Sequence, residues 1–282
     1  GVDYDFDPNL QGEPDWEACA RLRMKNANLL LMLQASDWSV TPTEFQRSTF
    51  PPSWRPRISC IHDGIDTELA KPDHGVAALA LPDGTRLNRG ESIVTFVNRH
   101  IEPYRGCHTF IRAIPLIQQS FPRARIVIVG RQDGVSYGRP APCGSWKTVF
   151  LREIEGHYDP SRVHFTGSLP YADFLQLLKL TACHVYLTYP FVLSWSLLEA
   201  MSSAAPVIGS ATSPVQEVIT DGQNGLLVNF FSPDALAEAI YSLLSDHGMA
   251  ESLGNQARQS VLERFGLHAV SYTHLRAHET LR

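Results

Sequence analysis

The feature that most constrains the fold is an alternation of short apolar segments with helical patterns, which begins at residue 92. Strands are expected at 92–97, 124–129, 163–166, 184–188, 206–209 and 226–228, and helices at 109–120, 147–155, 171–180, 194–203, 215–220, 234–245 and 249–265. Short strands that alternate with helices form right-handed β-α-β units around a parallel sheet. The sequence therefore predicts an α/β fold whose ligands bind beyond the carboxyl ends of the strands.

The first 90 residues have a different pattern. Residues 16–36 are expected to form a helix, because apolar residues such as Leu22, Leu29 and Leu33 recur near the helical period. A short strand is expected at 57–61. Residues 67–90 contain two prolines, three glycines and little apolar periodicity, so we expect a linker or an irregular insertion there.

Composition excludes several classes of protein. The 282 residues carry a net charge of −5 and no run of Lys or Arg, so a nucleic-acid surface is not expected. The five cysteines are scattered and form no C-x-x-C pair, which favours reduced thiols in a cytoplasmic compartment. The histidines show no metal-binding spacing, so no metal site is expected. The apolar segments fall far short of the roughly 20 residues that cross a bilayer.

Two arginines follow the first expected strand. The segment from Asn98 to Gly106 contains Arg99 and Arg105 between a strand and a helix. A guanidinium group donates two charge-assisted hydrogen bonds to a phosphate and stabilises the charge that grows on a departing diphosphate. The segment is therefore a candidate diphosphate site, and the alternative interpretation is a solvated surface loop.

A helix expected to begin near Ser194 follows the fourth strand. The backbone N–H groups of Ser194, Trp195 and Ser196 would face a ligand at the edge of the sheet, and a helix N-terminus favours phosphate. Glu199 lies one turn further among apolar neighbours, where its carboxylate needs partners that two ribose hydroxyls would supply. The alternative is an ordinary amphipathic helix whose glutamate pairs with an arginine.

The remaining turns carry weaker signals. Gly130 and Gly167 end two strands, and glycine allows a close approach of the backbone to a ligand. The segment from Gly167 to Tyr171, which contains Leu169, is a candidate lining for a base pocket. The chain contains no G-x-G-x-x-G fingerprint and no P-loop.

Taken in order, these segments resemble the family 4 glycosyltransferases, which are also called group 1. The matching segments are SDWSVTPT at 36–43, IHDGID at 61–66, RHIEPYRG at 99–106, LEAM at 198–201 with PVI at 206–208, and EVI at 217–219 with DGQNGLLV at 221–228. The resemblance extends from about residue 35 to residue 265.

The resemblance implies a GT-B architecture, in which two Rossmann-like domains face each other and the C-terminal one binds a nucleotide-sugar donor. Arg99 and Arg105 would hold the diphosphate and Glu199 the ribose. The rest of the implied donor site comprises Asn98, Gly130, Gly167, Leu169, Phe191, Leu193, Ser194, Trp195 and Ser196.

By the same resemblance, the protein would transfer a hexosyl group with retention of configuration. Side chains and a helix dipole would stabilise the charge without a metal, and no cofactor is expected because the nucleotide sugar is a substrate. The implied acceptor is a glycan or a lipid-linked molecule, in bacterial surface polysaccharide assembly. Such an enzyme would be cytoplasmic, with peripheral association at the inner face of the plasma membrane.

The chain departs from the family pattern in three respects. Phe191 stands where the family has a glutamate that contacts the donor sugar, and Arg105 stands where it has a lysine. The glycine-rich loop and the histidine of the acceptor domain are expected before residue 1, so the fragment is expected to be inactive alone.

The resemblance also divides the chain. We expect an acceptor-domain remnant at 1–66, the linker at 67–90, a complete nucleotide-sugar domain at 91–245, closing helices at 246–270, and a non-native tail at 271–282 that is similar to translated sequencing-adaptor read-through.

Two other functions fit the same sequence. A sugar-nucleotide 2-epimerase would share the facing domains but needs an acid–base pair in the cleft. A non-catalytic nucleotide-binding module would lack turnover, and Phe191 favours that alternative.

Overall fold

The computed structural model describes residues 16–138 and 140–271 of the chain. Its centre is a six-stranded sheet of β5 (Ile93–His100), β6 (Arg125–Arg131), β7 (Val163–Gly167), β8 (Cys183–Tyr186), β9 (Val207–Ser210) and β10 (Leu226–Val228). Every neighbouring pair in this sheet is parallel. The expected parallel α/β fold is therefore confirmed.

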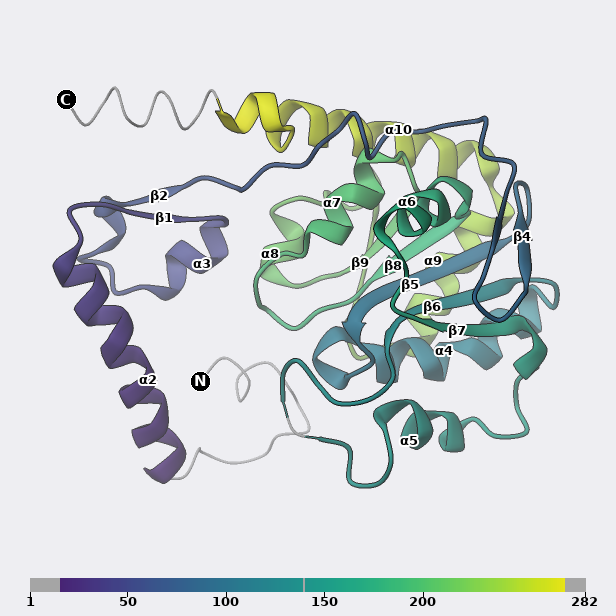
Figure 1. Cartoon of the computed structure of the whole chain (residues 1–282), viewed down its shortest axis with the longest axis horizontal. Coiled ribbons are helices and arrows are strands. Elements are labelled where there is room, and N and C mark those ends of the chain that lie inside the picture. Colours follow the sequence, from purple (N-terminus) through teal and green to yellow (C-terminus); the bar gives the residue numbers. More distant parts are fainter. Residues whose placement is uncertain (1–15, 139, 272–282) are drawn as a thin grey trace.

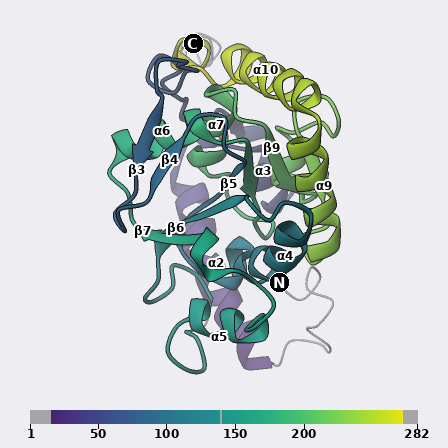
Figure 2. The same cartoon turned by 90° about the vertical axis from the view of Figure 1, so that its right-hand side faces the viewer.

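Helices cover both faces of the sheet (Figures 1 and 2). They are α4 (Cys107–Ser120), α5 (Trp146–Glu153), α6 (Tyr171–Leu180), α7 (Trp195–Ser202), α8 (Ser213–Gln216), α9 (Pro233–Ser245) and α10 (His247–Arg264), with short 3-10 turns η2 (Pro103–Arg105) and η3 (Pro160–Arg162). Helices α4, α5 and α9 share one apolar cluster with the strands, and α6, α7 and α8 share another.

The central strands are buried on both faces. In β5, Val94 and Phe96 point into the cluster with α4, whereas Ile93 points with Val127 and Val129 into a third cluster on the opposite face. Burial of a side chain of this size stabilises a fold by roughly 1.5–3 kcal/mol. Two-sided burial therefore explains why these strands read as continuous apolar segments.

The order of the sheet strands is β10-β9-β8-β5-β6-β7. The chain winds outward from β5 through β6 to β7, then returns to β8 and winds the other way. The two loops that follow β5 and β8 therefore diverge to opposite faces and leave a crevice between them. This crevice lies at the carboxyl ends of the two strands.

The linker expected at 67–90 is partly ordered. Strands β3 (Ala78–Ala80) and β4 (Arg86–Asn88) form an antiparallel hairpin, so the expectation of an irregular segment is wrong there. Leu79, Leu81 and Leu87 are buried against β5, β6 and α6. The hairpin is stabilised by the burial of these leucines against the rest of the domain. Its strands have only three residues each, which is too short for a periodic apolar pattern to show in the sequence.

The N-terminal part contains α2 (Trp16–Ala35), α3 (Glu44–Thr49), the 3-10 turn η1 (Arg55–Arg57) and a parallel pair of strands, β1 (Ser39–Thr41) and β2 (Ile58–Cys60). In Figure 1 these elements lie to one side of the large sheet. The helix expected at 16–36 is confirmed. Of its apolar residues, Leu33 is buried, whereas Leu22 and Leu29 are exposed within the described part of the chain.

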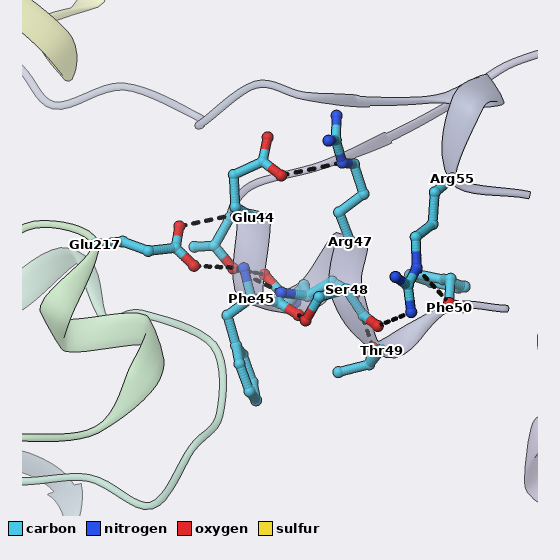
Figure 3. Close-up of polar contacts among 10 residues, drawn as sticks. Glu44, Phe45, Arg47, Ser48, Thr49, Phe50, Arg55 and Glu217 are labelled. Atoms are coloured by element: carbon cyan, nitrogen blue, oxygen red, sulfur yellow. Dashed lines mark hydrogen bonds and ion pairs between the residues drawn. The ribbon is translucent and has the colours of Figure 1, made fainter. Parts of the chain in front are cut away.

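One carboxylate connects the two parts of the chain. Glu217, which follows α8, accepts hydrogen bonds from the backbone N–H groups of Glu44 and Phe45 in the first turn of α3 (Figure 3). The first N–H groups of a helix have no partner inside the helix, and a carboxylate also interacts favourably with the helix dipole. Glu217 therefore caps a helix that lies more than 170 residues away in the sequence.

Some expectations fall on residues outside this description. The tail expected at 271–282 lies there apart from Ser271, as do residues 1–15 of the first expected domain. The domain boundaries stay predictions. Among the described helices, none is both long and apolar enough to cross a membrane.

A fully buried histidine makes the stability of the sheet depend on pH. His184 lies in β8, and its Nδ1 is 2.9 Å from Thr95 Oγ1. Burial lowers the pKa of His184 to about 4, from an ordinary value of 6.5. Between pH 6.5 and about 4, the histidine is protonated in the unfolded chain and neutral in the folded protein. The folded state therefore loses stability relative to the unfolded state as the pH falls through this range.

We predict that this group lowers the free energy of unfolding by about 3 kcal/mol as the pH falls from about 6.5 to about 4. The measurement is urea unfolding across this pH range, in the wild type and in His184→Gln, which cannot titrate. The variant should have the shallower dependence on pH. Parallel pH profiles for the two proteins would contradict the assignment.

Candidate functional site

A pocket of about 350 Å³ opens at the crevice between β5 and β8. It is lined by Val97, Asn98, Arg99, Glu102, Arg105, Val129, Arg131, Tyr137, Ser168, Leu169, Tyr171, Phe174, Ser194 and Ser196. Six of the residues predicted for the donor site are among them: Asn98, Arg99, Arg105, Leu169, Ser194 and Ser196. The structure thus brings together segments that are as much as 98 positions apart in the sequence.

Strand β5 is longer than expected. It continues past Val97 through an irregular register to His100, so Asn98 and Arg99 lie on the strand end and not in a loop. Arg99 is exposed at the pocket, and within the described residues no hydrogen bond or ion pair holds its guanidinium group. The Nδ2 atom of Asn98 is buried and likewise has no partner in this part of the chain.

Arg105 is held on several sides. One of its terminal nitrogens donates to Thr188 Oγ1 at 2.8 Å, and its Cζ lies 5.3 Å from the ring centre of Tyr137 and 5.4 Å from that of Phe191. The turn that presents it needs Gly106, whose φ is +73° and where a side chain would collide with Leu187. Arg105 and Arg99 line the same pocket, which concentrates positive charge at the crevice.

The start of α7 reaches the pocket mainly through side chains. The helix begins next to Ser194, as expected, with Ser194 as its cap, and Ser194 and Ser196 line the pocket. Two of the three backbone N–H groups expected to face a ligand already have partners, because Ser194 N donates to Tyr186 Oη at 2.9 Å and Ser196 N to Ser194 Oγ at 3.4 Å. What the helix offers a ligand is its dipole and its serine hydroxyls.

Glu199 is buried one turn into α7 and accepts a hydrogen bond from Tyr171 Oη at 2.8 Å. No arginine of the described residues pairs with Glu199, so the alternative of an arginine partner is wrong for this part of the chain. Burial raises the pKa of the Glu199 carboxyl group, and the Tyr171 hydrogen bond opposes this rise. Tyr171 lines the pocket and Glu199 does not, so the carboxylate lies behind the pocket wall and is connected to the pocket through this tyrosine.

The other predicted residues lie outside the pocket lining. Phe191 contacts Arg105, Gly130 is the second-last residue of β6, and Gly167 ends β7. Leu193 is buried in the core, and Trp195 is exposed with its Nε1 donating to Asp63 Oδ2 at 3.2 Å. Trp195 thereby connects α7 to the turn at 61–66.

Six pocket residues were not predicted: Val97, Glu102, Val129, Arg131, Tyr137 and Phe174. The two others, Ser168 and Tyr171, belong to the segment 167–171 that was expected to line a base pocket. Glu102 is fully buried, and its Oε2 accepts from the backbone N–H groups of Ser136 and Tyr137 at 3.0 and 2.9 Å. Its Oε1 is buried without a hydrogen-bond partner among the described residues. Burial raises the pKa of this carboxyl group, and the two N–H donors oppose the rise. The sequence carries one weak indication of this role, which is that Glu102 directly precedes Pro103 in the turn after the strand.

The pocket offers hydroxyl, guanidinium and carboxylate groups. The described residues contain no group of three or more His, Cys, Asp or Glu side chains that could hold a metal ion.

The fold is that of the GT-B glycosyltransferases. Sucrose-phosphate synthase from Thermosynechococcus elongatus superposes with a TM-score of 0.74 and 22% identity, which covers 99% of this chain and 65% of that one. HepE of Anabaena, solved in complex with UDP-glucose, gives a TM-score of 0.67 with 18% identity over 87% of this chain and 64% of that one.

The sequence assigns the family within this class. Residues 80–260 match the glycosyl transferases group 1, and residues 1–70 match the glycosyl transferase family 4 group. The chain belongs to the glycosyl transferases group 1 family.

Its relatives include a D-inositol 3-phosphate glycosyltransferase of Corynebacterium glutamicum, 26% identical over 71% of this chain and 46% of the relative. A glycogen synthase of Mycobacterium tuberculosis is 24% identical over 72% of this chain and 46% of the relative. The chain spans about half the length of the curated relatives it matches.

We predict that Glu102 holds the segment 134–138 over the pocket. In Glu102→Ala two backbone N–H groups lose their acceptor, so hydrogen–deuterium exchange of a peptide covering 134–138 should accelerate about tenfold or more. Glu102→Gln keeps an oxygen acceptor and should show a smaller change.

Asp133→Ala is the matched control, because Asp133 lies beside the same segment but is largely exposed. Unchanged exchange in Glu102→Ala would show that other contacts hold the segment.

Proposed function

We propose that this pocket binds a nucleotide-sugar donor and that the protein transfers the sugar to an acceptor with retention of configuration. The observation that carries the proposal is the convergence of Arg99, Arg105 and the start of α7 on one pocket at the switch point of the sheet. Three features that favour anions thus meet where doubly wound sheets bind nucleotides.

Different residues of the pocket bind the diphosphate, the ribose and the base of the donor. The diphosphate lies between Arg99, Arg105 and the Ser194 end of α7, where the guanidinium groups stabilise the charge that develops as the sugar departs. The ribose lies against Glu199 and Tyr171, since vicinal hydroxyl groups satisfy a buried carboxylate. Leu169 and Phe174 supply apolar surface for the base.

The solved relatives support the donor class. HepE of Anabaena was solved with UDP-glucose, and S. aureus TarM, of similar fold, with UDP and alpha-GlcNAc-glycerol. A glycan or lipid-linked acceptor, hexosyl transfer and peripheral association with a membrane stay predictions for this chain. Binding is the property to test first, because the residues of the proposed donor pocket all belong to this chain.

We predict that a nucleoside diphosphate stabilises the chain. Thermal unfolding with UDP, GDP or ADP should show a rise in Tm for at least one of them, because a ligand that binds the folded state shifts the equilibrium by mass action. Arg99→Ala and Glu199→Ala should each weaken that affinity about tenfold to a hundredfold, the magnitude of a charge-assisted hydrogen bond.

Arg112→Ala is the matched control, because Arg112 pairs with Glu153 outside the pocket. The proposal fails if no nucleotide raises Tm, or if the two site variants bind as tightly as this control.

A further inference from the structure

Arg105 is enclosed by two aromatic rings from distant segments. The rings of Tyr137 and Phe191 lie 4.7 Å apart at 60°, and the guanidinium carbon lies 5.3 and 5.4 Å from their centres. Both distances are within the range of roughly 6 Å in which a cation is attracted to a ring face. Thr188 accepts a hydrogen bond from one terminal nitrogen of the guanidinium group. The hydroxyl group and the two rings together therefore fix the orientation of the guanidinium plane.

The ring of Tyr137 is itself held in place. Glu102 accepts hydrogen bonds from the backbone of Ser136 and Tyr137, and His100 Nδ1 lies 2.6 Å from Ser136 Oγ. Gly138 has a φ of +75° and packs so closely on Tyr104 that an added Cβ would lie 2.6 Å from the ring. The segment therefore presents Tyr137 to Arg105 through contacts with the turn that also carries Arg105.

We propose that Tyr137 and Phe191 are positioning residues for Arg105 and orient its guanidinium group toward the diphosphate of the donor. This proposal rests on the proposed function. A planar guanidinium group stacks on aromatic faces while its edge donates two hydrogen bonds, whereas an ammonium group has no plane to hold.

The arrangement has a consequence for affinity. A pre-oriented guanidinium group loses less conformational freedom when the ligand binds, so the rings contribute to binding without contacting the phosphates. Phe191 is 39% exposed and its substitution leaves the core intact, which makes it the safer of the two positions to change.

The test measures binding of the nucleoside diphosphate that raises Tm most, by isothermal titration calorimetry on the full chain. Tyr137→Leu and Phe191→Leu should each weaken affinity about threefold to thirtyfold. Tyr137→Phe and Phe191→Trp keep a ring and should restore affinity to within about threefold of the wild type. Tyr241→Leu, at a half-exposed tyrosine on α9, is the matched control.

A double-mutant cycle separates positioning from direct contact. In an Arg105→Met background, Phe191→Leu should cause no further loss, because the ring acts only through Arg105. Additive losses, or wild-type affinity in both leucine variants, would overturn the proposal. If Arg105→Met weakens binding while the ring variants do not, only the positioning role fails. Unchanged affinity in Arg105→Met and in Arg99→Ala would instead remove the proposed function.

Discussion

The reversal of strand order between β5 and β8 governs the rest of this structure. Parallel strands deliver all their carboxyl ends to one edge, and the reversal separates the loops at a single point along that edge. The end of β5 supplies Asn98 and Arg99, and the connection after β8 leads to Ser194 and α7. Residues distant in the sequence become neighbours because the sheet order requires it.

Burial of polar groups gives this crevice its electrostatic character. Two carboxylates, Glu102 and Glu199, are withdrawn from water beside the pocket, and burial raises the pKa of each. Each is held by specific donors, which are backbone N–H groups for Glu102 and a phenol for Glu199. Glu102 Oε1 is buried without a partner among the described residues, and a buried acceptor of this kind carries a desolvation penalty.

The sequence predicts the sheet well because its strands are buried on both faces and read as continuous apolar segments between glycines. It also predicts that Arg99, Arg105 and Ser196 share a pocket, since each follows a strand or begins a helix. It does not reveal the hairpin of β3 and β4, whose buried leucines are too few to form a period. Nor does it reveal the Glu102 contacts, because their partners lie 34 and 35 residues away across an irregular loop.

The cap that Glu217 places on α3 has a mechanical consequence (Figure 3). The Glu217 side chain extends from the part of the chain that carries the pocket to the part that carries β1 and β2. A hydrogen bond weakens when its donor and acceptor move apart. Ile65 N also donates to Phe265 O, and Trp195 Nε1 donates to Asp63 Oδ2, so Glu217 is one of several hydrogen-bonded contacts between the two parts. A movement of one part against the other would have to keep or break these hydrogen bonds, and Glu217 therefore restricts such a movement.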